Sequence, residues 1–283
     1  MRKLPFRLTV AGAATIAVIG AFPLAQAAVH QFSADESCAD SPSDAKPAAV
    51  PKKIDFNGDG YEDVASGSPN SQVGEQSNAG YVSVVYGSAD GPAPGSKTSP
   101  PQVLSSENPE VPLEHSTADY VGQQILARDL DADGFTDLVF SFRTIEGDHD
   151  YGGPGLVAMF GSEEGLRDGV TLKGGDGTEQ YDSDRTFAIG DFTGDDKTDI
   201  IVGLGVEDGL LVGPFTRDGK PSDIREVPAG THQENMTWTV TAGDLTGDGV
   251  DDLVATQDSD FGSEPDLVIK GGEDGLTAMQ PEK

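Results

Sequence analysis

Asp129-Leu-Asp-Ala-Asp-Gly-Phe-Thr-Asp137, followed at once by Leu138-Val139-Phe140, is the stretch that decides the fold of this chain. The same order of aspartates, a tight loop and an apolar run recurs in loops that begin at Asp55, Asp191 and Asp244. An aspartate-rich loop that leads directly into an apolar, β-prone run predicts one supersecondary unit. Four copies of that unit predict a repeat protein.

The sequence around the loops repeats as well, and it predicts β-strands. Short β-prone runs precede the last three loops at residues 124–127, 186–189 and 238–241. The strands predicted downstream are Gly80–Tyr86, Gly155–Phe160, Leu210–Val212 and Asp266–Lys270, and fourth strands are predicted at residues 103–104, 170–172 and 224–227. Gly-x-x-x-Gly turns follow three of these strands, and no stretch keeps a helical period. The sequence therefore predicts an all-β chain with four strands in each unit.

Four-stranded units of this kind are typical of β-propeller blades, because neighbouring sheets must stack to bury their faces. The first unit lacks a clear strand before its loop, since residues 50–54 form a poor one. The last unit ends at Lys283 with a weak fourth strand. The four recognisable repeats therefore predict a small ring closed by strands from both termini, or an incomplete array.

The loops have the residue types of a calcium site. When each loop is numbered from its first aspartate, oxygen-bearing side chains stand at positions one, three, five and nine. Ca²⁺ prefers six to eight oxygen ligands, including backbone carbonyls. The predicted side-chain ligands are Asp55, Asn57, Asp59 and Asp63; Asp129, Asp131, Asp133 and Asp137; Asp191, Thr193, Asp195 and Asp199; and Asp244, Thr246, Asp248 and Asp252. Position seven is predicted to offer the carbonyls of Tyr61, Phe135, Lys197 and Val250, so up to four Ca²⁺ ions are expected.

These loops differ from EF-hands, which need a bidentate Glu at position 12 and a following helix. Position 12 is Ser66, Phe140, Val202 or Ala255 here, and a strand is predicted after position nine. The alternative is that the aspartates only form polar turns, but four clusters of carboxylates without a cation would repel strongly. With four aspartates, the second loop is predicted to bind most tightly. The third is predicted to bind most weakly, because Asp196 replaces the glycine of position six.

The N-terminus predicts secretion. Basic residues, an apolar run and Ala25-Gln26-Ala27 form a signal peptide over residues 1–27, cleaved before Ala28, although a membrane anchor is the alternative. Residues 28–50 are expected to form a disordered leader that holds the only cysteine, Cys38, and residues 51–283 the repeat domain. A net charge of −31 argues against nucleic-acid binding. No membrane span is expected in the mature chain.

The loops with their trailing strands resemble the FG-GAP (VCBS-like) repeat family, the blade type of the integrin α propeller and of many secreted bacterial proteins. Tyr120-Val-Gly122 stands where that family has Phe-Gly, and Ser68-Pro69 stands roughly where it has Gly-Ala-Pro. The resemblance covers about residues 50–283 and implies calcium at the loop side chains. Integrin-type rings have seven blades, whereas only four loops occur here. A small ring, a ring with degenerate blades and an open array that assembles therefore remain open.

The sequence indicates a binding, adhesion or scaffold module more strongly than an enzyme. The four histidines have no zinc-type spacing, and no Gly-x-Ser-x-Gly motif occurs. The alternative is a calcium-stabilised polysaccharide-active enzyme, a lyase or hydrolase, on a propeller scaffold. Extracellular proteins or glycans are the expected partners. The aromatic residues that could stack on sugars are Tyr81, Tyr86, Tyr120, Tyr151, Tyr181 and Trp238.

Overall fold

The computed structural model describes most of the predicted repeat domain. The described residues are 53–91, 100–114, 118–146, 150–172, 187–202, 209–227, 237–258 and 267–278. The predicted signal peptide, the predicted leader and Cys38 lie outside them. Within the described residues no helix is present, and hence none that could cross a membrane.

The described strands form four antiparallel sheets, one for each repeat. The first sheet contains β1 (Val64–Gly67), β2 (Val82–Val85) and β3 (Gln102–Leu104). The second contains β4 (Ala118–Asp119), β5 (Ile125–Arg128), β6 (Asp137–Glu146), β7 (Asp150–Phe160) and β8 (Arg167–Thr171). The third contains β9 (Phe187–Gly190), β10 (Asp199–Val202), β11 (Gly209–Val212) and β12 (Asp223–Glu226). The fourth contains β13 (Thr237–Gly243), β14 (Asp252–Asp258), β15 (Leu267–Lys270) and β16 (Thr277–Ala278).

The second, third and fourth repeats fold in the predicted order of strand, aspartate loop, strand, long connection, strand, turn and strand, and the first repeat follows it from its loop onward. The Gly-x-x-x-Gly segments close as tight turns, because the last glycine donates its N–H to a carbonyl three residues earlier, at 2.7–2.9 Å. These glycines, Gly91, Gly165 and Gly275, have φ of 94°, 94° and 96°. Such values favour glycine over residues with a side chain. The prediction of all-β blades is thus confirmed.

The first repeat lacks a described strand before its loop and the last repeat has a short fourth strand, as predicted. In the first repeat, a bond from Asp63 N to Ile54 O, 2.7 Å long, nevertheless ties the segment before the loop to the residue just before β1. The fourth sheet ends in the two-residue β16. The second sheet instead gains a short edge strand, β4, which pairs with the far end of β6.

Three hydrophobic cores fill the spaces between successive sheets. In β6, Leu138 and Phe140 face the first core while Val139 faces the second. In β10, Ile200 faces the second core while Ile201 faces the third. The alternation of side chains along a strand places neighbouring residues on opposite faces. The second and third sheets are therefore buried on both faces, which explains their continuous apolar runs.

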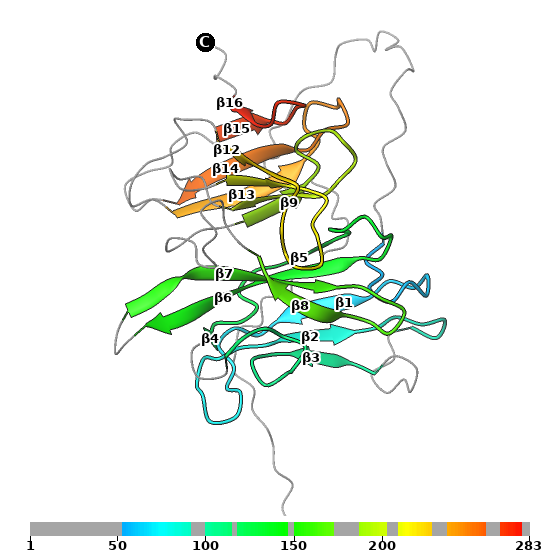
Figure 1. Ribbon diagram of the computed structural model, residues 1–283, viewed down its shortest axis with the longest axis vertical. Coiled ribbons are helices and arrows are strands. Elements are labelled where there is room, and N and C mark those ends of the chain that lie inside the picture. Colours follow the sequence, from blue (N-terminus) through cyan, green and yellow to red (C-terminus); the bar gives the residue numbers. More distant parts are fainter. Residues whose placement is uncertain are drawn as a thin grey trace, which may run out of the picture.

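The cyan first sheet lies toward one end of the described strands, the green second sheet follows it, and the third and fourth sheets overlap toward the other end (Figure 1). Among the described strands, β1 contacts β5, β5 contacts β9 and β9 contacts β13, but no strand of the first sheet contacts one of the fourth. The described sheets form an open stack and not a closed ring. Within the part of the chain that the structure describes, one face of the first sheet and one face of the fourth have no neighbouring sheet.

Candidate metal sites

The first aspartate organises each loop by accepting backbone N–H groups from later positions. Asp55 Oδ2 accepts from Gly60 N at 2.8 Å, and Asp244 Oδ2 accepts from Gly249 N at 3.0 Å. A short carboxylate that binds the backbone a few residues ahead is the usual reason for aspartate in tight turns. These hydrogen bonds lie within a single loop, so the shape of the loop does not depend on a neighbouring sheet.

Two positions in every loop have a left-handed backbone. Position six has a positive φ in all four loops, and φ is 62° even at Asp196, where the other loops have glycine. Position four was not anticipated from the sequence, yet it is left-handed in all four loops, including Ala132 with φ of 61°. Residues with a Cβ rarely adopt this conformation. The second and third loops therefore each carry one strained residue.

The ninth position holds a buried aspartate that clamps the loop to its own sheet. Asp137 Oδ2 accepts from Leu130 N and Asp137 Oδ1 accepts from Gly161 N, both at 2.7 Å. Burial raises the pKa of Asp137 to about 7, although the two backbone bonds oppose this rise. Burial likewise raises the pKa of Asp63 to about 6. The corresponding clamps join Asp63 to Phe56 N and Gly87 N, Asp199 to Phe192 N and Gly213 N, and Asp252 to Leu245 N and Gly271 N.

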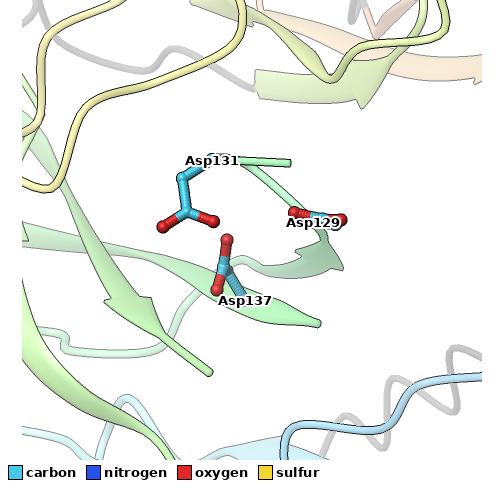
Figure 2. A group of neighbouring side chains, drawn as sticks. All are labelled: Asp129, Asp131 and Asp137. Atoms are coloured by element: carbon cyan, nitrogen blue, oxygen red, sulfur yellow. The ribbon is translucent and has the colours of Figure 1, made fainter. Parts of the chain in front are cut away.

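The second loop brings three predicted ligands together. One carboxylate oxygen from each of Asp129, Asp131 and Asp137 lies within 4.8 Å of the other two. Figure 2 shows these side chains around a common space, with Asp129 just after β5 and Asp137 at the start of β6. Two oxygens on one Ca²⁺ can be at most about 5 Å apart, which is twice the bond length. The spacing therefore fits a single cation.

An unsatisfied atom also points to a cation at the second loop. Asp129 Oδ1 is buried and has no hydrogen-bond partner, whereas Asp129 Oδ2 accepts from Gly134 N at 3.0 Å. Leaving a buried carboxylate oxygen without a donor is unfavourable, and native proteins seldom do so. A bound cation would satisfy this oxygen, so the donor set of the second loop fits Ca²⁺.

Every other predicted ligand lies within the described residues, but the remaining loops form no comparable acidic group there. The difference arises at position three. In the third loop Thr193 Oγ1 donates to Asp199 Oδ2 at 3.0 Å, and in the first loop Asn57 Nδ2 donates to Asp59 Oδ2 at 3.2 Å. The first, third and fourth loops nevertheless retain aspartate at positions one, five and nine.

An arginine from the turn between β11 and β12 of the third sheet reaches the second loop, and no motif in the sequence predicts this contact. Arg217 Nε lies 2.9 Å from Asp131 Oδ2, and Arg217 Nη2 lies 2.6 Å from Asp133 Oδ2. The guanidinium carbon lies 5.1 Å from the centre of the Phe160 ring. Burial and Asp133 raise the pKa of Asp131, and Arg217 opposes that rise. Arg217 lies after Leu210–Val212, the one predicted third strand that no Gly-x-x-x-Gly turn follows. That departure from the repeat is the only feature of the sequence that sets the segment around Arg217 apart.

The fourth loop is paired differently, with a lysine from its own sheet. Lys270 Nζ lies 2.8 Å from Asp248 Oδ2, and this hydrogen bond lowers the pKa of Asp248. Lys270 is the last residue of β15, the strand whose end the Asp252 clamp also holds. The basic partner of this loop therefore comes from within the repeat, whereas that of the second loop comes from the next repeat.

Comparison with known proteins supports the family resemblance within one repeat. A search of curated proteins found no match for this chain. The sequence model of a family described as FG-GAP repeat matches residues 54–85. These residues contain the first aspartate loop, β1 and β2, and the other three sheets repeat the same order of loop and strands. The chain therefore carries an FG-GAP repeat at residues 54–85.

Proposed function

We propose that this chain is a secreted, calcium-binding repeat module that acts in binding, adhesion or scaffolding. The observation that carries this proposal is the group of Asp129, Asp131 and Asp137, in which the buried Asp129 Oδ1 has no hydrogen-bond donor. The signal-type sequence of residues 1–27 supports secretion. Extracellular fluids contain Ca²⁺ at concentrations that loops of this kind can bind.

The residues of the second loop would hold the ion between two strands of one sheet. Asp129 and Asp131 would supply carboxylate oxygens from the loop, and Asp137 would supply one from the first residue of β6. Bound Ca²⁺ would neutralise carboxylates that otherwise repel one another. The other loops, with aspartate at positions one, five and nine, would hold further ions, up to four in all. Each bound ion would reduce the charge repulsion that opposes compaction in a chain with a net charge of −31.

Calcium titration combined with thermal unfolding tests the proposal. At a free Ca²⁺ concentration 100 times the dissociation constant, one site stabilises the folded chain by about 2.7 kcal/mol. Chelation should therefore lower Tm markedly. Asp129→Asn should weaken the tightest Ca²⁺ binding by about tenfold or more, because a ligand charge is lost.

Asp90→Asn is the matched control, since it removes the same charge at an exposed turn residue that belongs to none of the four aspartate loops. It should leave calorimetric binding unchanged. An equal Tm with Ca²⁺ and with chelator would contradict the calcium proposal.

A shallow hollow offers one place for a glycan. It has a volume of about 280 Å³ and is lined by Pro69, Asn70, Tyr120, Gln123 and Arg143. Ligand pockets commonly combine an aromatic surface with a few polar groups. Of the other aromatic candidates, Tyr86 is buried in the first core, while Tyr181 and the side chains of Tyr151 and Trp238 lie outside what the structure describes.

Glycan-array binding that Tyr120→Ala abolishes would support glycan recognition at this hollow. Binding that is unaffected by Tyr120→Ala would contradict it. Product formation from a polysaccharide would favour the alternative function, a polysaccharide-active enzyme.

A further inference from the structure

The same junction joins every pair of neighbouring sheets, and its first part is the apolar residue at position two of each aspartate loop. Phe56, Leu130 and Phe192 are fully buried, each in the core between its own sheet and the next. Leu245 occupies the same position in the fourth loop, yet 53 % of it is exposed. The difference follows from the stack, because no described sheet follows the fourth.

The second part of the junction is the carbonyl of the same position-two residue. In each of the first three loops it accepts an N–H from the turn or segment after the third strand of the next sheet. The three bonds run from Ser162 N to Phe56 O (3.1 Å), from Phe215 N to Leu130 O (2.8 Å) and from Gly272 N to Phe192 O (2.9 Å). Among the described residues no such bond reaches the carbonyl of Leu245. In the first sheet, Ser88 holds the place that Ser162 holds in the second.

The third part links the loops to one another through position eight. In each junction the position-eight residue bonds to the backbone of the first aspartate in the preceding loop. The bonds are Asp55 N to Thr136 Oγ1 (3.1 Å), Thr136 N to Asp55 O (3.1 Å), Thr198 Oγ1 to Asp129 O (2.5 Å), Asp251 N to Asp191 O (2.8 Å) and Asp191 N to Asp251 Oδ2 (2.8 Å). Position eight thus connects the four loops in series.

The two ends of the stack present the two halves of this junction. The fourth loop offers the exposed side chain of Leu245 and the backbone of Asp244. The first repeat offers Ser88 and the exposed Glu62, which is the position-eight residue of the first loop. Glu62 has a carboxylate, as does Asp251, which already accepts the N–H of a first aspartate. The halves are complementary in the way that the three internal junctions are.

The open sheet faces next to these halves also suit each other. The outward face of the first sheet carries Val64, Ser66, Ser83, Val85 and Val103, and Val64 and Val103 are exposed. The outward face of the fourth carries Thr239, Thr241, Val254, Thr256 and Val268. No residue in the three strands of the first sheet is charged, although the chain carries a net charge of −31. Charge that would keep copies apart is therefore absent from this sheet.

We propose that the fourth sheet of one copy of this chain docks on the first sheet of a second copy, head to tail. Leu245 would then be covered as Phe56 is, with its carbonyl accepting from Ser88 N of the second copy. The carboxylate of Glu62 in that copy would accept the N–H of Asp244. The first and fourth sheets of one copy lie at opposite ends of its stack, so the occupant is a second copy (Figure 1). Such a contact is heterologous and either closes into a ring or continues as a filament.

Sedimentation of the mature chain in Ca²⁺ buffer, over a range of concentrations, tests the proposal. The wild type should form dimers or longer assemblies, and Leu245→Glu should weaken self-association by about tenfold or more, because it places a charge in the buried contact. Ile224→Glu is the matched control: Ile224 is 41 % exposed but lies on β12, away from both ends. It should associate as the wild type does.

Mixing two blocked variants separates head-to-tail docking from other modes of association. Val64→Glu blocks the first-sheet end, Leu245→Glu blocks the fourth-sheet end, and each variant alone should remain monomeric. A mixture of the two should form a dimer and nothing larger, because one intact end of each kind remains. Glu62→Lys is a second block at the first-sheet end and covers the case in which Val64→Glu unfolds.

Three results would overturn the proposal. The first is a wild type that is monomeric at every concentration. The second is equal weakening by Leu245→Glu and Ile224→Glu. The third is a mixture of folded blocked variants that stays monomeric.

Discussion

The second and fourth aspartate loops share one sequence pattern but occupy different environments. At the second loop Leu130 is fully buried under the third sheet, and Asp129 Oδ1 is buried as well. At the fourth loop Leu245 is more than half exposed, and Asp244 is exposed. The loops have the same left-handed positions and the same clamp at position nine. The next sheet in the stack, and not the loop alone, therefore sets the environment of each site.

The basic partners of the two loops support the same conclusion. Arg217 approaches the second loop from the third sheet and contacts two of its aspartates. Lys270 approaches the fourth loop from its own sheet and contacts one. Both are exposed enough for water to weaken their ion pairs. Under the calcium proposal their cationic groups would compete with Ca²⁺ for the same carboxylates, so the neighbouring residues would also tune calcium affinity.

The largest expected difference between the two loops concerns position two. Leu130→Ala should lower the free energy of unfolding by about 3 kcal/mol, because it leaves a cavity in the second core. Leu245→Ala should lower it by only about 0.5 kcal/mol in the monomer, because the side chain is mostly in water. Urea unfolding at a concentration where the chain is monomeric measures both. Equal losses at the two positions would show that Leu245 is buried in the monomer.

A second difference concerns calcium affinity at the second loop. Arg217→Ala should strengthen Ca²⁺ binding there by about tenfold, because it removes a positive charge that contacts Asp131 and Asp133. It should also destabilise the calcium-free chain by about 1 kcal/mol, because two carboxylates lose their partner. Calorimetric titration measures the affinity, and Arg217→Lys, which keeps the charge, is the control. Weaker binding in Arg217→Ala would mean that Arg217 positions the ligands and does not compete for them.

The arrangement within each repeat could be predicted from the sequence because the interactions that form it are local. The strand after Asp137 and the turn that ends at Gly165 depend on residues close in the chain, and both were located correctly. The three-membered acidic group in the second loop also follows from local spacing, since it has aspartate at position three where the other loops have Asn57, Thr193 or Thr246.

The contacts between repeats could not be predicted, because they depend on how sheets pack. Arg217 lies more than 80 residues from the aspartates that it contacts, and only the third sheet's position brings it there. Thr136 and Asp251 both stand at position eight of their loops, and both bond to the first aspartate of the preceding loop. One is threonine and the other aspartate, so no shared residue type marks this role in the sequence. The open stack likewise depends on the relative rotation of whole sheets, which no local pattern encodes.

The smallest expected difference concerns position four of the loops. Ala132 has φ of 61° in the second loop, and Gly247 has φ of 74° in the fourth. Ala132→Gly should raise the free energy of unfolding by about 1 kcal/mol, because it relieves a left-handed conformation that is costly for alanine.

Gly247→Ala should lower that free energy by about 1 kcal/mol, and strain is the only cause, since an added Cβ would meet no atom within 4 Å. Urea unfolding of both variants with chelator present measures the pair without a contribution from the metal. Because both changes act on one backbone position, their effects should be opposite in sign and similar in size. A destabilising Ala132→Gly would mean that the Ala132 methyl group contributes packing at the junction with the third sheet. At the next junction there is no room for such a group, because a Cβ added to Gly194, position four of the third loop, would lie 2.8 Å from Val250 Cγ2. The second and fourth loops would then differ at position four for the same reason that they differ at position two, which is the presence of a following sheet.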